Sequence, residues 1–234
     1  IDAELEKRRG GSKVRPMPED VQNLIDAREV FSDIEMKIGQ TEAADALAPQ
    51  YRYDNAMIYY NYGNFEEAEK RFSEIIEKSP TSQHASSAAD IIIAEYDLRG
   101  DLDKVAELSD MYSTMQLGSE GGASDDIVNS RFKDKKYNAL FKKAFNLFDN
   151  HQYLEAAAEF IRIIDENPTF EHNNRAMYNA AYAYEQMKYY DSAMRLYRRV
   201  LNEYKDTEEA VNALYRIGVN AEKFFDFETA VDSF

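Results

Sequence analysis

The sequence predicts an all-α fold, a right-handed superhelical solenoid of antiparallel helix pairs. Three observations predict it. The 234 residues include only 9 Gly and 5 Pro, so turns are few and regular elements are long. A pattern of small and aromatic residues recurs at a spacing of 37 residues. Within each copy the apolar residues follow the helical period, and two copies end at a proline.

The second helix of each expected pair carries the clearest pattern: an aromatic residue, Ala three later, an aromatic four further on, then an aliphatic residue. The copies are Phe65, Ala68, Phe72, Ile75, Pro80; Tyr153, Ala156, Phe160, Ile163, Pro168; Tyr190, Ala193, Tyr197, Val200; and the incomplete Phe227, Ala230, Phe234. A degenerate copy reads Leu102, Val105, Ser109, Tyr112, and Lys205 replaces the proline of the third copy. The alanine permits a close helix–helix approach, and the following aromatic lies one turn on along the same face.

The first helix of each pair carries a small residue at the equivalent position in four units: Ala56, Ala144, Ala181 and Gly218. Gly63 and Asn64 predict a helix-ending turn between the two helices of the first pair. The prolines end the second helices because proline lacks an N–H donor and clashes with the preceding turn.

Domain boundaries follow from this register. We expect a tail or linker over 1–17, N-terminal capping helices over 18–48, repeats 1 and 2 over 49–117, an insertion loop and connector over 118–136, and repeats 3 to 5 over 137–234, the last truncated. A short helix over 41–47 should precede Pro49, which suits the first turn of the next helix. The Gly- and Asp-rich 118–130 segment interrupts the 37-residue rhythm and is expected to be mobile. The chain opens without Met and stops inside a helical pattern, so we expect a piece of a longer protein.

These residues resemble the tetratricopeptide repeat family. Small residues match its first-helix position, and Gly63, Phe65, Ala68, Phe72 and Pro80 match its turn, second-helix and terminator positions. The signature Trp is absent, and polar Asn55 stands at a usually apolar site. The resemblance covers about 49–234. It implies a scaffold that binds other proteins, and the 37-residue spacing is similar to bacterial cell-envelope members such as Tol–Pal-associated proteins and β-barrel-assembly lipoproteins.

Composition excludes several classes of function. The net charge of −16 disfavours nucleic acid, whose phosphates would be repelled. Cysteine is absent, so disulfides and thiolate chemistry are excluded. No apolar run approaches the roughly 20 residues that span a bilayer. From the envelope resemblance we expect a periplasmic or outer-membrane-associated protein, with a cytoplasmic location as the alternative.

No catalytic, metal or cofactor site is predicted. His84, His151 and His172 have no second His or Cys at ligand spacing, and phosphate-binding, nucleophile-elbow and dinucleotide motifs are absent. We therefore expect a non-enzyme. A basic cluster from Arg131 to Lys143 is interpreted mainly as balancing nearby aspartates, with a site for an acidic partner as the alternative.

We expect the first helices of the pairs to line a groove rich in aromatic residues. The predicted partner-binding residues are Tyr53, Met57, Tyr60, Phe141, Phe145, Arg175, Tyr178, Tyr182 and Tyr215. Phe141, Tyr178 and Tyr215 recur at intervals of 37 residues, and equivalent positions in stacked hairpins lie side by side. The groove is expected to bind another protein or peptide, Arg175 and Glu185 orienting its polar groups. Alternatives are an oligomerisation module, with self-association, or a regulatory domain of a larger enzyme.

Overall fold

The computed structural model describes residues 14–38, 42–118, 125–223 and 226–233, and these residues are helical with no strand. The chain divides into two compact units, Ile1–Lys136 and Tyr137–Phe234. The first contains α2 (Glu19–Ile38), α3 (Glu42–Asn61), α4 (Phe65–Lys78), α5 (Gln83–Arg99) and α6 (Leu102–Ser113). The second contains α8 (Tyr153–Glu166), α9 (Asn173–Gln186), α10 (Tyr190–Glu203), α11 (Glu208–Lys223) and α12 (Phe227–Ser233). Helix α7 (Asp125–Asp149) contributes to both units.

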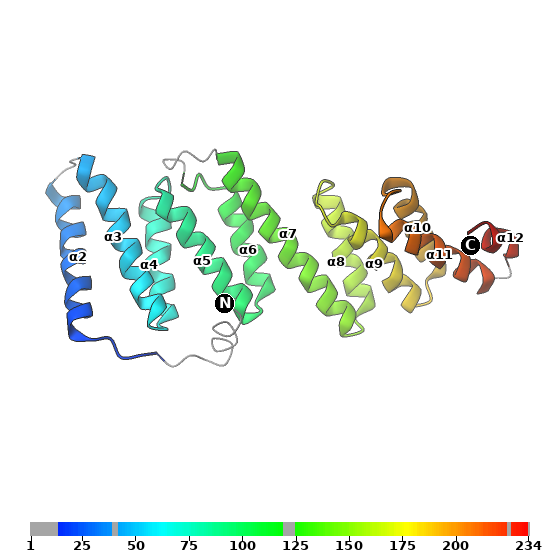
Figure 1. Ribbon diagram of the computed structural model, residues 1–234, viewed down its shortest axis with the longest axis horizontal. Coiled ribbons are helices and arrows are strands. Elements are labelled where there is room, and N and C mark those ends of the chain that lie inside the picture. The colour runs from blue at the N-terminus through cyan, green and yellow to red at the C-terminus, as the bar shows by residue number, and fades with distance from the viewer. Residues whose placement is uncertain (1–13, 39–41, 119–124, 224–225, 234) are drawn as a thin grey trace. The chain divides into compact units, whose positions relative to one another are not determined.

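Within each unit, helices that follow one another in the chain pack side by side (Figure 1). The α3–α4, α8–α9 and α9–α10 pairs have the most extensive packing, and α3 also contacts α5 as α9 contacts α11. The first helix of one pair therefore lies next to the first helix of the following pair. The expected all-α architecture, a solenoid of antiparallel helix pairs, is confirmed.

The repeat register places the packing residues as expected. Ala68, Phe72 and Ile75 are buried in α4. Their counterparts in α8 and α10, which are Ala156, Phe160, Ile163, Ala193, Tyr197 and Val200, are all 0% exposed. Ala56, Ala144 and Ala181 of the first helices are also fully buried. Burial of these aromatic and aliphatic side chains is the main driving force for pairing the helices.

The turns inside the pairs use the left-handed backbone conformation at equivalent positions. Gly63 and Gly100 have φ of 82° and 77°, and His151 and Lys188 have φ of 62° and 63°. The turn at Gly63 was predicted from the sequence. His151 and Lys188 place a residue with a Cβ where glycine is favoured, at a conformational cost of about 1–2 kcal/mol.

The second helices end at equivalent residues whether or not a proline follows. Helices α4, α8 and α10 end at Lys78, Glu166 and Glu203. In each case the next amide donates to a carbonyl four residues back, Ser79 to Ile75, Asn167 to Ile163 and Tyr204 to Val200, all at 2.9 Å. Pro80 and Pro168 reinforce a stop that the third unit achieves with Lys205.

The prediction of two helices meeting at Pro49 is wrong. Helix α3 is continuous from Glu42 to Asn61 and contains Pro49 in its interior. A proline removes one backbone hydrogen bond and bends a helix, but tertiary packing can hold the helix through it. Pro49 and the preceding Ala48 are buried, which provides that packing.

The expected connector over 118–136 is also corrected. Residues 125–136 form the first part of α7, and its 25 residues run into the first helix of the third pair. Val128 and Phe132 are buried one turn apart, and the Phe132 ring lies 5.8 Å from that of Tyr112. This apolar pair holds the segment as helix although charged residues surround it. Residues 119–124, on which much of the expected mobility falls, lie outside the described residues.

Candidate functional site

An aromatic strip runs along the first helices of the second unit. We define it as Phe141, Phe145 and Phe148 of α7 with Tyr178 and Tyr182 of α9. The Phe148 and Tyr182 rings stack with centroids 5.5 Å apart and planes at 26°. Tyr178 and Tyr182 are nearly parallel, with centroids 6.5 Å apart, and Phe141 meets Phe145 edge-on at 4.9 Å. The rings of the strip thus form two contacting groups in this unit, Phe141 with Phe145 and Phe148 with Tyr182 and Tyr178.

Exposure differs along this strip. Phe145, Phe148, Tyr178 and Tyr182 are half-buried, so each ring packs on one side and meets solvent on the other. Phe141 is only 7% exposed. The prediction that it contacts a partner therefore needs correction: the Phe141 ring supports its neighbours from below. Its sequence spacing matches that of Tyr178, but spacing alone does not show which rings a neighbouring helix covers.

Phe141 is covered by the segment that follows the second helix. The ring of His172 stacks on it at 5.4 Å and 30°, and Phe170 meets it at 5.9 Å. The first unit repeats this arrangement, with the His84 ring 5.2 Å from Tyr53. Each histidine follows its proline by four residues, a regularity that could have predicted the contact. Both histidines therefore contribute to packing.

Two arginines lie over the strip. The Arg175 guanidinium carbon lies 5.6 Å from the centroid of Phe141 and 5.9 Å from that of Phe145. Arg216 of α11 lies 4.6 Å from the Tyr182 centroid. Such cation–π contacts are worth about 0.5–1 kcal/mol at exposed sites. Arg175 is exposed and forms no ion pair with any residue that the structure describes.

Glu185 holds Arg216 in place from inside the unit. The Tyr197 hydroxyl donates to Glu185 Oε2 at 2.9 Å, and Arg216 Nη1 lies 3.4 Å from Glu185 Oε1. Burial, together with the charge of Glu185, raises the pKa of Tyr197 well above its usual value. Glu185 is only 7% exposed. The expectation that it orients a bound segment directly is corrected: it acts on Arg216.

The remaining predicted residues lie on α3 and α11. On α3, Tyr53, Met57 and Tyr60 are half-buried. The Tyr53 ring lies 5.6 Å from Phe72, and Tyr60 lies 5.2 Å from Phe65. These three residues belong to the first unit. Tyr215 of α11 is 58% exposed.

The basic cluster pairs with acidic residues that sequence reasoning missed. Arg131 and Lys135 lie 3.0 and 3.6 Å from Asp90, and Lys136 lies 3.0 Å from Asp110. The balancing aspartates come from α5 and α6 because residues 125–136 are helical and pack against that unit. Among the described residues there is no group of His, Asp or Glu that could hold a metal ion. None of the described helices is both long and apolar enough to cross a membrane.

Helix pairs in a fixed register, with alanines at the contacts and aromatics on the first helices, define a helical-repeat protein. Residues 175–207 match the tetratricopeptide repeat family, and this segment spans α9, α10 and the turn that follows. No curated protein matches the chain.

Two solved structures align with this chain. The crystal structure of BtubC (BKLC) from P. vanneervenii is 13% identical, with 92% of this chain and 89% of that chain covered and a TM-score of 0.41. The TPR2AB domain of yeast Sti1, in a pHSP90 complex, is 15% identical, with 100% and 89% covered and a TM-score of 0.35.

Proposed function

We propose that this chain is a non-catalytic interaction scaffold that binds a partner protein or peptide at the aromatic strip. The observation that carries the proposal is the half-exposed stack of Phe148, Tyr182 and Tyr178, with Arg216 over Tyr182 and Arg175 over Phe141 and Phe145. Tyr and Phe offer large contact area at low cost in side-chain entropy, which is why aromatic residues are enriched at interfaces. The rings are already held by packing, so binding would not have to order them.

The charges around the strip favour a particular partner chemistry. Arg216 is neutralised by Glu185, but Arg175 is exposed and is paired only with aromatic faces among the described residues. A suitable partner segment would place an apolar or aromatic side chain on the exposed rings and a nearby carboxylate beside Arg175. The apolar anchor would supply affinity and the carboxylate would set its orientation.

The test begins with affinity capture by the whole protein and identification of what it retains. The Tyr182→Ala and Tyr215→Ala variants are then compared with the parent for binding to that partner. We expect each to bind at least about tenfold more weakly, because truncating an aromatic anchor typically costs over 1 kcal/mol. Tyr189→Ala is the matched control, since Tyr189 is 57% exposed and lies in the turn before α10.

Circular dichroism and the melting temperature establish that each variant is folded. Unchanged affinity in Tyr182→Ala would show that the strip is not the site, and unchanged affinity in Tyr215→Ala would show that the site does not extend to α11. An equal loss in Tyr189→Ala would show that the effect is not specific to the strip.

We also propose a place in the bacterial cell envelope, periplasmic or associated with the outer membrane. The support is the 37-residue spacing and its similarity to envelope repeat proteins. Fractionation of the native host, with detection of the full-length protein, tests it. Recovery with the cytoplasmic markers would contradict the proposal.

Self-association is a second candidate function. Val211 and Leu214 of α11 are 69% and 39% exposed, although the residue equivalent to Leu214 in α9, Met177, is fully buried. A second copy could cover this apolar row. Sedimentation equilibrium separates the two functions, because a dimer lost in Leu214→Ser would favour self-association, and a monomer at all concentrations would exclude it.

A further inference from the structure

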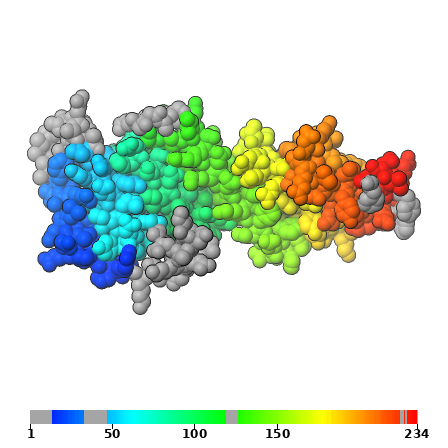
Figure 2. Space-filling model, in the orientation of Figure 1, coloured from blue at the N-terminus to red at the C-terminus, as the bar shows by residue number. Residues whose placement is uncertain are grey.

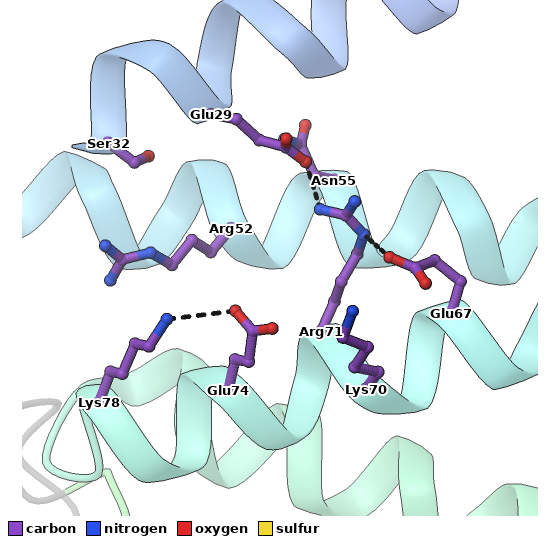
Figure 3. Close-up of a pocket in the computed structure, with 9 residues that line it drawn as sticks. All are labelled: Glu29, Ser32, Arg52, Asn55, Glu67, Lys70, Arg71, Glu74 and Lys78. Carbon is purple, nitrogen blue, oxygen red and sulfur yellow. Dashed lines mark hydrogen bonds and ion pairs between the residues drawn. The ribbon is translucent and has the colours of Figure 1, made fainter. Parts of the chain in front are cut away.

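A charged pocket lies between α2, α3 and α4 of the first unit, with a volume of about 230 Å³ (Figure 3). Four cationic side chains line it, Arg52, Lys70, Arg71 and Lys78, against three carboxylates from Glu29, Glu67 and Glu74. Among the described lining residues the cations therefore outnumber the carboxylates by one, although the chain as a whole carries −16. In a chain with so many acidic residues, these cationic side chains lie together only because the fold places them there.

Most of these charges are already paired. Arg71 forms ion pairs with Glu29 and with Glu67, the latter at 2.9 Å, and its guanidinium carbon lies 4.4 Å from the centroid of Tyr59. Lys78 lies 3.3 Å from Glu74. Arg71 forms ion pairs with two of the three carboxylates and links α4 to α2, so its role is structural.

Arg52 is different. Its Nη2 atom is shielded from solvent and has no hydrogen-bond partner. Neither Arg52 nor Lys70 forms an ion pair with another described residue. In Figure 3 the Arg52 side chain extends along the pocket toward the end that Ser32 and Lys78 line. A buried charged donor without an acceptor is costly, and such a group in a native protein calls for a partner.

The polar neighbours of Arg52 do not supply this partner. Ser32 is 3% exposed and donates to the carbonyl of Arg28 at 2.9 Å. Asn55 is 2% exposed, donates to the carbonyl of Ile25 at 3.2 Å and accepts from Arg28 at 3.5 Å. Both are engaged with α2.

We propose that this pocket binds an oxyanion, a carboxylate or phosphate group, with Arg52 as its principal ligand and Lys70 and Lys78 as supporting charges. The planar guanidinium fits two oxygens of such a group, and charge-assisted bonds of this kind are the strong ones. The anion would pair with the Arg52 guanidinium and offset the excess of cations among the described lining residues.

The oxyanion pocket is separate from the predicted partner-binding residues of α3. Arg52, Asn55 and Tyr59 recur at helical spacing on one face of α3, while Tyr53, Met57 and Tyr60 follow a different face. The two sites can therefore be tested independently. Failure of one leaves the other intact.

The test uses the whole protein and two probes, inorganic phosphate and succinate, with sodium chloride at matched ionic strength as the reference. Nitrogen-15 NMR of the arginine side chains follows binding at the Arg52 Nε resonance, which the Arg52→Gln variant identifies. We expect a saturable shift of that resonance with phosphate, succinate or both. The dissociation constant measured by calorimetry should be at least about tenfold higher in Arg52→Gln. The probe that binds more tightly identifies the phosphate or the carboxylate as the source of the group.

Arg195→Gln is the matched control, because Arg195 is exposed on α10 and its one described side-chain bond is to Ser192. It should bind as the parent does. Arg52→Lys keeps the charge and loses the planar fork, so it should bind with intermediate affinity. The proposal is overturned if neither probe shifts the Arg52 resonance beyond the chloride reference, or if Arg52→Gln and Arg195→Gln bind equally well.

Discussion

The left-handed backbone conformation in the turns costs conformational free energy where the residue has a Cβ, so the cost differs between units. Lys188 is exposed at φ 63°, and Gly100 has open space around the position of a Cβ at φ 77°. We expect Lys188→Gly to stabilise the protein by about 1 kcal/mol and Gly100→Ala to destabilise it by a similar amount, because only backbone conformation changes. Chemical denaturation measures both. If both variants changed the free energy of unfolding in the same direction, this explanation would be wrong.

His84 makes the first unit sensitive to acid. Burial lowers the pKa of the His84 ring, and the charge of Asp54 opposes this effect only in part. The unfolded chain, with a pKa near 6.5, then binds the proton more readily than the folded chain. The stabilising contribution is present above about pH 6.5 and is lost as the pH falls below it.

We therefore expect the melting temperature to fall less between pH 7.5 and 5.5 in His84→Gln than in the parent. An NMR titration of the His84 ring checks the cause directly. A midpoint at or above 6.5 would remove the basis for this prediction.

The sequence predicted burial correctly for residues that repeat in register. It failed for residues whose burial depends on side chains from other parts of the chain. Ala156, Phe160 and Ile163 recur in register, and each is buried as predicted. Phe141 and Glu185 occupy positions assigned to the groove, yet both are buried. Their burial depends on His172, in the turn before α9, and on Tyr197 of α10, and a spacing pattern contains no information about those contacts.

At the scale of the helix, the buried alanines set how closely two helices approach. Ala193 is 0% exposed in α10, which packs against α9 and α11. We expect Ala193→Leu to overpack these contacts and lower the free energy of unfolding by about 1–3 kcal/mol. Ala158→Leu on the exposed side of α8 is the control and should change stability by less than about 0.5 kcal/mol. An unchanged midpoint in Ala193→Leu would mean that the contact is looser than the burial indicates.

Helix boundaries were predictable in the regular repeats and not at the two interruptions. The stops after α4 and α8 follow from Pro80 and Pro168. The continuous α3 depends on burial of Pro49, and the early start of α7 depends on Val128 and Phe132 packing into the first unit. Local signals at both places favour a break, and tertiary packing overrides them.

At the scale of the whole molecule, contacts within each unit join neighbouring helices and alternate first helices. Stability in such a chain is approximately a sum of repeat and nearest-neighbour contributions. We expect hydrogen exchange in Ala193→Leu to accelerate in α9, α10 and α11 while α3 and α4 keep the protection of the parent. Exchange measured by mass spectrometry checks this, and equal acceleration in both units would indicate a single cooperative fold.

Three second helices stop at equivalent residues although a proline follows only two of them. Each pair therefore contains its own turn, its own core contacts and its own stop within one 37-residue period. For protein engineering this makes the pair an interchangeable building block. Copying the segment between one helix stop and the next should lengthen the protein by one unit without redesign of its neighbours, and different binding faces could be joined in a chosen order.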